Sequence, residues 1–329
     1  MKKLFYLMTF CLTSWASVAQ KTQHKEAFAH TFSIVARDPK TGDMAVGVQS
    51  HWFSVGTTVS WAEAGVGAIA TQSFVNKSFG IRGLTLLKEG KNAQDVLDIL
   101  LSDDQGKEVR QVGIVDAKGN VAVHTGKNCV DYAGHVKGTQ FSVQSNMMLT
   151  DKVPAAMAKA FESSANLPLA ERVLKAMEAA QAVGGDIRGK QSAALLVVNA
   201  TDTGKPWDDN HKVDLRVDDH ILPLVELARL LKVQRAYEHM NEGDLAVEKN
   251  DMKKAMEEYG AAMKMFPNNL EMQYWTAIAL ANSHEIKKAV TMLKKIYSKD
   301  MNWLEMTKRL PKVGLLTVSD AELKQLVLR

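Results

Sequence analysis

The sequence predicts an α+β fold, a four-layer αββα sandwich followed by an all-helical C-terminal region. Strand patterns alternate with pairs of helices over residues 31–231, the order expected when two sheets pack together between outer helices. The pattern by itself is equally compatible with a generic α+β fold. From residue 232 to residue 329, glycine becomes rare, strand patterns stop, and Lys, Glu, Met and Ala dominate. A repeated spacing of small residues in this second part predicts paired helices.

Period-two alternation and short apolar runs mark the strands of the first part. The first two strands form a hairpin around a turn at residues 38–42, and a second hairpin turns at Lys118–Gly119–Asn120. The predicted strands cover residues 31–37, 44–50, 65–73, 110–117, 121–126, 140–148, 192–200 and 212–219. The last of these alternates charged and apolar residues, as a solvated edge strand does.

Helical periodicity and capping residues mark the helices between these strands. Asn92 is expected to cap the second helix, and Gly184–Gly185 to end the fourth. The predicted helices cover residues 80–88, 93–101, 154–163 and 168–183, and a further one opens at Pro223.

The N-terminal residues 1–19 predict a secretory signal peptide. Two lysines precede an apolar core at residues 4–12, and Ser17–Val18–Ala19 forms a cleavage site for signal peptidase. Residues 20–30 form a short polar leader. The mature protein is therefore predicted to be periplasmic or secreted.

The composition narrows the classes of partner. A net charge of +4 is too small to predict binding to nucleic acid or to an anionic membrane surface. No segment after the signal is apolar over a length that spans a bilayer, so the protein is predicted not to be membrane-embedded. Because Cys11 lies in the signal, Cys129 has no intrachain partner and is either a small buried side chain or a functional thiol.

The C-terminal residues 232–329 contain an internal repeat with a period of about 34 residues. The first copy is marked by Gly243, Ala255, Tyr259, Ala262 and Pro267, and the second by Ala277, Ala289, Leu293, Ile296 and Met301. This spacing is typical of tetratricopeptide repeats, in which small residues allow two helices to approach closely. A third, divergent unit could follow, with Ser319 capping its last helix. The alternative is an unrelated helical bundle.

Thr31 stands at the start of the first predicted strand. A hydroxyl residue in this position suits a mechanism in which the α-amine of the same residue activates the side chain as a nucleophile. That mechanism requires a cut between His30 and Thr31, whereas signal peptidase would leave Gln20 at the terminus. Self-cleavage or trimming of the leader is therefore needed, and otherwise Thr31 is an ordinary strand residue.

Six stretches resemble, in the same order, the DUF1028 family, which is assigned to the N-terminal-nucleophile hydrolase superfamily. They are TFSIVARDPKTGDMAVGVQS, AGVGAIATQSFVNKSFGIRGL, RQVGIVDAKGNVAVHTGKNCVDYAGH, FSVQSNMM, GGDIRGKQSAALLVV and VDLRVDDH. The resemblance spans residues 31–231 and implies an αββα sandwich of the proteasome and aspartylglucosaminidase type. It implies Thr31 as the nucleophile and no particular substrate.

Other candidate site residues lie at the ends of strands. Ser50 and His51 end the second strand and are expected beside Thr31, where His51 could orient or titrate a reacting group or be a plain loop residue. Asn146 ends a central strand and could bind the amine of Thr31, or simply form a turn.

The junction of strand and helix at residues 71–76 is where the superfamily places an oxyanion hole. Gln72 and Asn76 could donate hydrogen bonds to a developing oxyanion, and Ser73 is a candidate substrate contact. Arg82 near the start of the next helix suits a substrate carboxylate. The alternative is that Asn76 caps the helix and Arg82 is an exposed surface residue.

No metal or cofactor is predicted. The donor residues His124, Cys129, Asp131 and His135 are close in sequence, but their spacing matches no standard zinc motif. No phosphate-binding loop, nucleophile elbow or dinucleotide motif is present.

The sequence therefore predicts an exported amide-bond hydrolase that acts on a small peptide or an amino-acid amide. The alternative is a non-catalytic periplasmic binding or scaffold protein whose tetratricopeptide-like helices dock a partner peptide. Superfamily members often assemble from several subunits, so a homo-oligomer is compatible with the resemblance.

Overall fold

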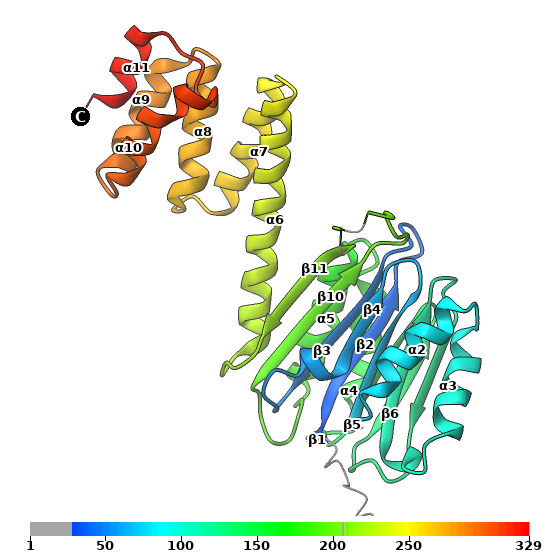
Figure 1. The fold of residues 1–329 in the computed structure, drawn as a ribbon. Helices are drawn as coiled ribbons and strands as arrows, with labels where there is room; N and C mark the ends of the chain where they lie inside the picture. Colours follow the sequence, from blue (N-terminus) through cyan, green and yellow to red (C-terminus); the bar gives the residue numbers. More distant parts are fainter. Residues whose placement is uncertain (1–27, 206, 209, 329) are drawn as a thin grey trace, which may run out of the picture.

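The computed structural model describes residues 28–205, 207–208 and 210–328 (Figure 1). The predicted signal peptide and most of the leader lie outside the described residues. The predicted α+β class is confirmed, with two antiparallel sheets followed by an all-helical C-terminal region.

Two sheets are built from the strands of the first part. One has the order β1-β5-β6-β7, with β4 pairing on β5, and the other has the order β11-β10-β3-β2-β9-β8. The strand pairs are antiparallel throughout. The strands are β1 Phe28–Ala29, β2 Thr31–Arg37, β3 Met44–Ser50, β4 Ser60–Glu63, β5 Gly67–Phe74, β6 Arg110–Asp116, β7 Val121–Thr125, β8 Gly134–Gly138, β9 Phe141–Ser145, β10 Ser192–Val198 and β11 His211–Val217.

Helices cover the outer faces of both sheets (Figure 1). The helices α2 and α3 lie against β4 to β7, whereas α4, α5 and the first part of α6 lie against the larger sheet. The helices up to the start of the C-terminal region are α1 Gly56–Val59, α2 Ser78–Lys88, α3 Ala93–Ser102, α4 Val153–Ser163, α5 Leu169–Ala182 and α6 Pro223–Glu248, and Lys107–Val109 forms a short 3₁₀ turn.

The two sheets pack face to face, and the layer between them changes character along the strands. At one end it is apolar and contains Val35, Val46 and Val115. At the other end, where β2 begins, it is filled by the buried amides of Gln72, Gln111 and Gln144 together with Ser33 and Asn146. Alternation along the same strands sends Phe32 and Ile34 to the opposite face, against the helices.

The chain passes from one sheet to the other at His30. The leader strand β1 pairs with the end of β5, Phe28 opposite Phe74 and Ala29 opposite Ser73, and the next strand β2 lies in the other sheet. The strand β4 pairs with the earlier part of β5, and β6 occupies the other edge of that strand. Residues 28–29 therefore extend the edge position of β4, and the bond between His30 and Thr31 spans the two sheets.

Most predicted elements are confirmed, and the missed ones are short. Asn92 caps α3 by accepting from the backbone of Gln94 and Asp95, and β11 lies at a sheet edge as expected. The strands β1, β4 and β8 and the helix α1 were not predicted. Each has two to five residues, too few to show a period, and their pairing is decided by the neighbouring strands.

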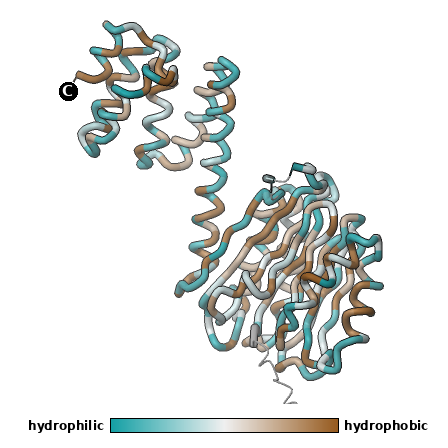
Figure 2. The backbone as a smooth tube through the Cα atoms, viewed as in Figure 1, coloured by the Kyte–Doolittle hydropathy of each residue, from teal (hydrophilic) through white to brown (hydrophobic). Residues whose placement is uncertain are grey.

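The helix α6 joins the two parts of the chain (Figure 1). Its first turns pack on β10 and β11, and its later turns pack on α7, so the predicted boundary at residues 231–232 falls inside one continuous helix. Figure 2 shows this change as a largely hydrophobic stretch along the sheet that becomes mainly hydrophilic beyond it.

The C-terminal helices pack as antiparallel neighbours. Gly243 of α6 faces the ring of Tyr259 on α7 so closely that a β-carbon on Gly243 would lie 2.4 Å from that ring. The helices are α7 Met252–Met265, α8 Leu270–Asn282, α9 Ile286–Tyr297, α10 Asn302–Arg309 and α11 Asp320–Val327, with a 3₁₀ turn at Leu310–Val313. Ser319 forms a capping box with Glu322 at the start of α11, as its position in the sequence predicts.

None of the helices in the described part of the chain combines the length and the apolar character needed to cross a membrane.

Candidate functional site

Thr31 is the first residue of β2 and is fully buried where the chain crosses between the sheets. The antiparallel register places Ser50, the last residue of β3, directly opposite Thr31. The main chain of Thr31 is fixed from the other side because its carbonyl accepts from the backbone N–H of Asn146 at 3.1 Å. The strand ends therefore hold this residue rigidly.

The carbonyl oxygen of His30 is bound by two side chains. The hydroxyl of Ser50 donates to it at 2.5 Å, and Nη2 of Arg188 donates to it at 2.8 Å. This carbonyl belongs to the peptide bond just before Thr31. A hydroxyl and a guanidinium directed at one carbonyl oxygen polarise it, and they would stabilise negative charge developing on it.

Asp186 holds Arg188 in this position. Its carboxylate accepts from Nε of Arg188 at 3.1 Å and from Nη2 at 2.7 Å, and also from the backbone N–H of His51 at 3.0 Å. The Asp186 side chain is fully buried, whereas that of Arg188 is 27% exposed. A buried carboxylate with this many donors orients the guanidinium instead of leaving it to sample other rotamers.

The side-chain amides of Gln72, Gln111 and Asn146 are buried and hydrogen-bonded to one another, and their partners decide which end of each amide is the oxygen. Nε2 of Gln111 faces the carbonyls of Gly134 and Ser145, which can only accept, so this end of the side chain must be the NH₂ group. Its Oε1 therefore accepts from Nε2 of Gln72 at 2.7 Å and from Nδ2 of Asn146 at 2.8 Å.

The chain of amides leaves Oδ1 of Asn146 facing the ring of His30. Nδ1 of His30 lies 2.7 Å from this oxygen, and because the oxygen can only accept, Nδ1 must carry the proton. Burial lowers the pKa of His30 from its ordinary value, and the bond to Asn146 and the charge of Asp186 oppose that shift only in part. The imidazole is therefore neutral in the folded chain at neutral pH.

This lowered pKa predicts a pH dependence for the uncut protein. The unfolded chain takes up a proton on His30 more readily than the folded chain, so the contribution to stability is present above pH 6.5 and is lost as the pH falls toward the folded pKa. In a Thr31→Ala background, the urea midpoint should fall between about pH 7.5 and about pH 5.5. The added His30→Gln change keeps a hydrogen-bond donor but does not titrate, so it should make that fall smaller. An equal fall in both proteins would contradict the conclusion that His30 causes it.

Backbone strain lies next to the same residues. Ser73, which follows Gln72, has φ of 71°, and Met147, which follows Asn146, has φ of 57°. Such left-handed conformations are costly for residues other than glycine, and they concentrate at functional sites. Both residues lie where a strand carrying a site amide ends.

The structure brings together five of the predicted site residues. Ser50, Gln72 and Asn146 are buried around Thr31 or the residue before it, and Ser73 is buried opposite Ala29 of the leader strand. His51 is adjacent to this group, but its contact there is made by its backbone N–H on Asp186, and the side chain is exposed.

The structure does not bring Asn76 and Arg82 to this group. Oδ1 of Asn76 accepts from the backbone and hydroxyl of Ser78 at the start of α2. Arg82 lies on the outer helix α2 and pairs with Asp103 at 2.6 Å, with both side chains partly exposed. The local alternatives, a helix-start contact for Asn76 and a surface position for Arg82, describe these two residues better.

Three residues of the site were missed by the sequence analysis: Gln111, Asp186 and Arg188. The last two stand in the stretch GGDIRGK, where glycines at φ of 62° and 117° bracket a D-x-R spacing. An acidic and a basic residue held between glycine turns was the available signal. Gln111 carried none, because a single polar residue in an apolar strand does not reveal its partners.

Cys129 and its histidine neighbours are accounted for by other contacts. Cys129 is buried, its thiol donates to the carbonyl of Arg110 at 3.4 Å, and burial raises its pKa. His124 contacts the carbonyl of Lys107, and His135 contacts the hydroxyl of Thr125. Across the residues that the structure describes, no group of three or more His, Cys, Asp or Glu side chains is arranged to hold a metal ion.

Comparison with known proteins identifies relatives of the two-sheet part of the chain. The family described as a family of unknown function, DUF1028, matches residues 31–227. The crystal structure of protein SPO2555 from Silicibacter pomeroyi, described as DUF1028, is similar at 30% sequence identity with a TM-score of 0.55. That match covers 62% of this chain and 88% of the other. No curated protein matches the chain.

Proposed function

The chain belongs to the DUF1028 family, a family of unknown function, and from that premise we propose that it is an amide-bond hydrolase with Thr31 as an N-terminal nucleophile. The observation that carries this proposal is the environment of the bond before Thr31. That bond lies between the sheets, and Ser50 and Arg188 both donate to its carbonyl oxygen. An ordinary strand start needs no such pair of donors.

The first reaction is self-cleavage. Oγ1 of Thr31 attacks the carbonyl carbon of His30, and the negative charge that develops on the oxygen is stabilised by Ser50 and Arg188. The bond between the His30 carbonyl carbon and the Thr31 nitrogen breaks, and the hydroxyl proton ends on that nitrogen. Water then hydrolyses the resulting ester, which leaves a carboxylate on His30 and a free amine and hydroxyl on Thr31.

The second reaction repeats this chemistry on a substrate. The free amine of Thr31 takes the hydroxyl proton, directly or through a water, while the oxygen attacks a substrate amide. The amine of the substrate leaves with a proton, and water releases the acyl group from Thr31. The same two donors would serve the substrate carbonyl, because Ser50 and Asp186–Arg188 belong to elements that the cut does not sever.

Further support comes from the layout of the sandwich and from the family match. Two facing sheets with outer helices are the arrangement expected of N-terminal-nucleophile hydrolases, and the nucleophile position in that arrangement is the start of a central strand. The family match begins at Thr31, so the leader lies outside it. Export directed by the N-terminal segment 1–19 is part of the same proposal. Removal of that signal would leave the leader as the N-terminal segment that the cut before Thr31 then releases.

The N-terminal residue and the intact mass of the full chain, secreted from a bacterial host, test this function. A mature chain that starts at Thr31 supports it. A chain that starts at Gln20 after prolonged incubation contradicts it, because His30 would still acylate the amine that must act as base.

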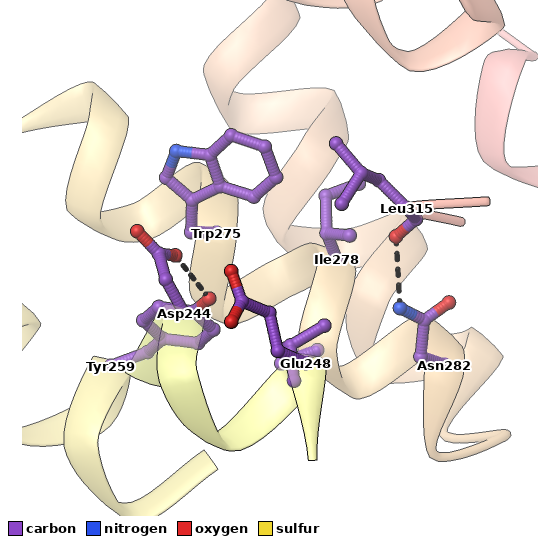
Figure 3. A pocket seen from close by; sticks show the side chains of 9 residues that line it. Asp244, Glu248, Tyr259, Trp275, Ile278, Asn282 and Leu315 are labelled. Atoms are coloured by element: carbon purple, nitrogen blue, oxygen red, sulfur yellow. Dashed lines mark hydrogen bonds between the residues drawn. The ribbon is translucent and has the colours of Figure 1, made fainter. Parts of the chain in front are cut away.

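A second candidate function concerns the C-terminal helices. We propose that they form tetratricopeptide-like pairs that dock a peptide with a basic side chain. The supporting observation is a cavity of about 320 Å³ between α6, α7 and α8 (Figure 3). Rings of Tyr259 and Trp275 and the side chain of Ile278 line it, and Asp244 and Glu248 of α6 supply carboxylates.

The chemistry of this cavity favours a cation on an apolar stem. Asp244 is already bound by the hydroxyl of Tyr259 at 2.6 Å, whereas Figure 3 shows the carboxylate of Glu248 directed into the space between Trp275 and Ile278. A lysine or arginine side chain would place its methylenes on the apolar wall and its charge at Glu248.

The proposed docking site predicts weaker peptide binding when the negative charge of Glu248 is removed. A labelled peptide with a single lysine between leucines should bind to the full chain, and Glu248→Gln should weaken that binding several-fold, more so at low salt. Glu257→Gln, an exposed change on α7, is the matched control and should leave binding unchanged. Equal binding by the two variants would remove this candidate.

A further inference from the structure

The leader strand occupies one edge of β5 and leaves that edge open once it is removed. The pairs Phe28–Phe74 and Ala29–Ser73 are antiparallel, and β4 covers only the stretch from Gly67 to Ala70 on the same edge. After a cut at His30, the backbone groups at the end of β5 lose their partner. An extended peptide could replace the leader there by adding a strand to the sheet.

The space now filled by the His30 side chain has a defined chemical preference. His30 is 1% exposed, its ring meets that of Phe74 edge-on at 6.0 Å between centroids, and Nδ1 lies on Oδ1 of Asn146. Because the amide chain through Gln111 fixes which atom of Asn146 is presented, this space offers an acceptor and no donor at that point. A planar side chain with an N–H group fits it, and an aliphatic chain leaves the buried oxygen unpaired.

The carbonyl of His30 is the group that the proposed self-cleavage attacks. It is bonded to the residue that carries the nucleophile, and it is held by Ser50 and by Arg188. A substrate carbonyl must reach the same donors to be attacked by Thr31. The acyl residue of a substrate therefore binds where His30 now lies, and the residues before it bind where β1 now lies.

We propose that the leader is a built-in copy of the acyl half of the substrate. The mature enzyme then acts on extended peptides whose acyl residue, the one that supplies the attacked carbonyl, carries a planar side chain with an N–H donor. Histidine is the first choice, and glutamine is the second. This inference rests on the proposed function, since it uses the reaction of Thr31, but it adds a substrate class that the reaction alone does not define.

The test uses the full chain after processing, with its N-terminal residue confirmed. The probes are acetyl-Ala-Phe-Ala-X p-nitroanilides, in which X is His, Gln, Leu or Glu, and the first four residues for X = His repeat residues 27–30 of the leader. We expect kcat/KM for X = His to exceed that for X = Leu by at least about tenfold, the effect of leaving one buried acceptor unpaired. The glutamine probe should fall between them.

Asn146→Leu is the matched variant. The quantity compared is the ratio of kcat/KM for the His probe to kcat/KM for the Leu probe, not the activity on either probe alone. Removing the acceptor should abolish most of the preference for His over Leu, whereas general damage to the site would lower both rates together. Leu or Glu probes cleaved as well as the His probe by the unaltered enzyme would overturn the inference and leave the hydrolase function intact.

A binding measurement separates the remaining outcomes. If the processed chain releases no p-nitroaniline from any probe, calorimetry with the peptide acid acetyl-Ala-Phe-Ala-His decides between two cases. If this peptide binds at least about tenfold more tightly than its Leu analogue, the result supports the acyl site and contradicts the hydrolase function. No binding overturns the inference, as does a chain that never loses its leader, because its site would never open.

Discussion

A chain with Arg188 replaced by glutamine is expected to cut its His30–Thr31 bond about 100- to 1,000-fold more slowly than the wild type, the usual effect of losing one oxyanion donor. The guanidinium donates to the His30 carbonyl at 2.8 Å and adds a positive charge that the glutamine amide lacks. Thr31→Ala should abolish the cut entirely because no nucleophile remains. The measurement is the fraction of cut chain against time, read from intact mass.

Two further variants separate the loss of the donor at Arg188 from general damage to the fold as the cause of a slower cut. Arg229→Gln changes an exposed arginine of α6 that pairs with Glu226, and it should cut at the wild-type rate. Asp186→Asn keeps the size of the side chain but weakens its hold on Arg188, so it should slow the cut less than Arg188→Gln does. A wild-type rate in the Arg188→Gln chain would show that this donor is structural and does not promote the cut.

The second large effect is expected on stability. Replacing Gln111 with leucine removes the hub of the buried amide chain, so that Gln72, Asn146 and the carbonyl of Ser145 each lose a partner. Nε2 of Gln72 keeps the carbonyls of Thr31 and Gln144 as acceptors, whereas Nδ2 of Asn146 loses its acceptor. Because a buried group left unpaired costs about 1–3 kcal/mol, we expect the free energy of unfolding to fall by about 1–3 kcal/mol. Urea unfolding in a Thr31→Ala background, where both chains stay uncut, measures this change.

An exposed glutamine provides the control for this prediction. Gln94 lies on the surface of α3 and donates to Asp98 at 2.9 Å, so Gln94→Leu should change the free energy of unfolding by less than about 0.5 kcal/mol. A loss below about 1 kcal/mol for Gln111→Leu would mean that the amides around it find other partners when it is removed.

The uncut state also explains why the candidate site is closed. Thr31, Ser50, Gln72 and Asn146 are all fully buried while the leader strand is in place. In the function proposed above, the site is open to substrate only after residue 30 and the residues before it have been removed. Processing and activation are then one event, which would confine the activity to chains that have finished folding.

Local sequence determined most of the strands and helices. A period of two or 3.6 residues depends only on the alternation of nearby side chains, so the hairpin of β2 and β3, the capped helix α3 and the helix opening at Pro223 could be predicted from residues close together. The position of Thr31 at a strand start, and Ser50 at the end of the strand opposite it, followed from the hairpin alone.

Only the tertiary structure decided which distant polar residues meet. Arg188 lies far from His30 in sequence. The amides of Gln72 and Gln111 come from two strands of one sheet, and that of Asn146 follows a strand of the other sheet, so no spacing in the sequence could pair them. The same is true of Arg82, whose place near a helix start suggested an anion contact until the packing of α2 and α3 set it beside Asp103. Periodicity is a local property of the chain, whereas a hydrogen bond between strands depends on register and on how the two sheets face each other.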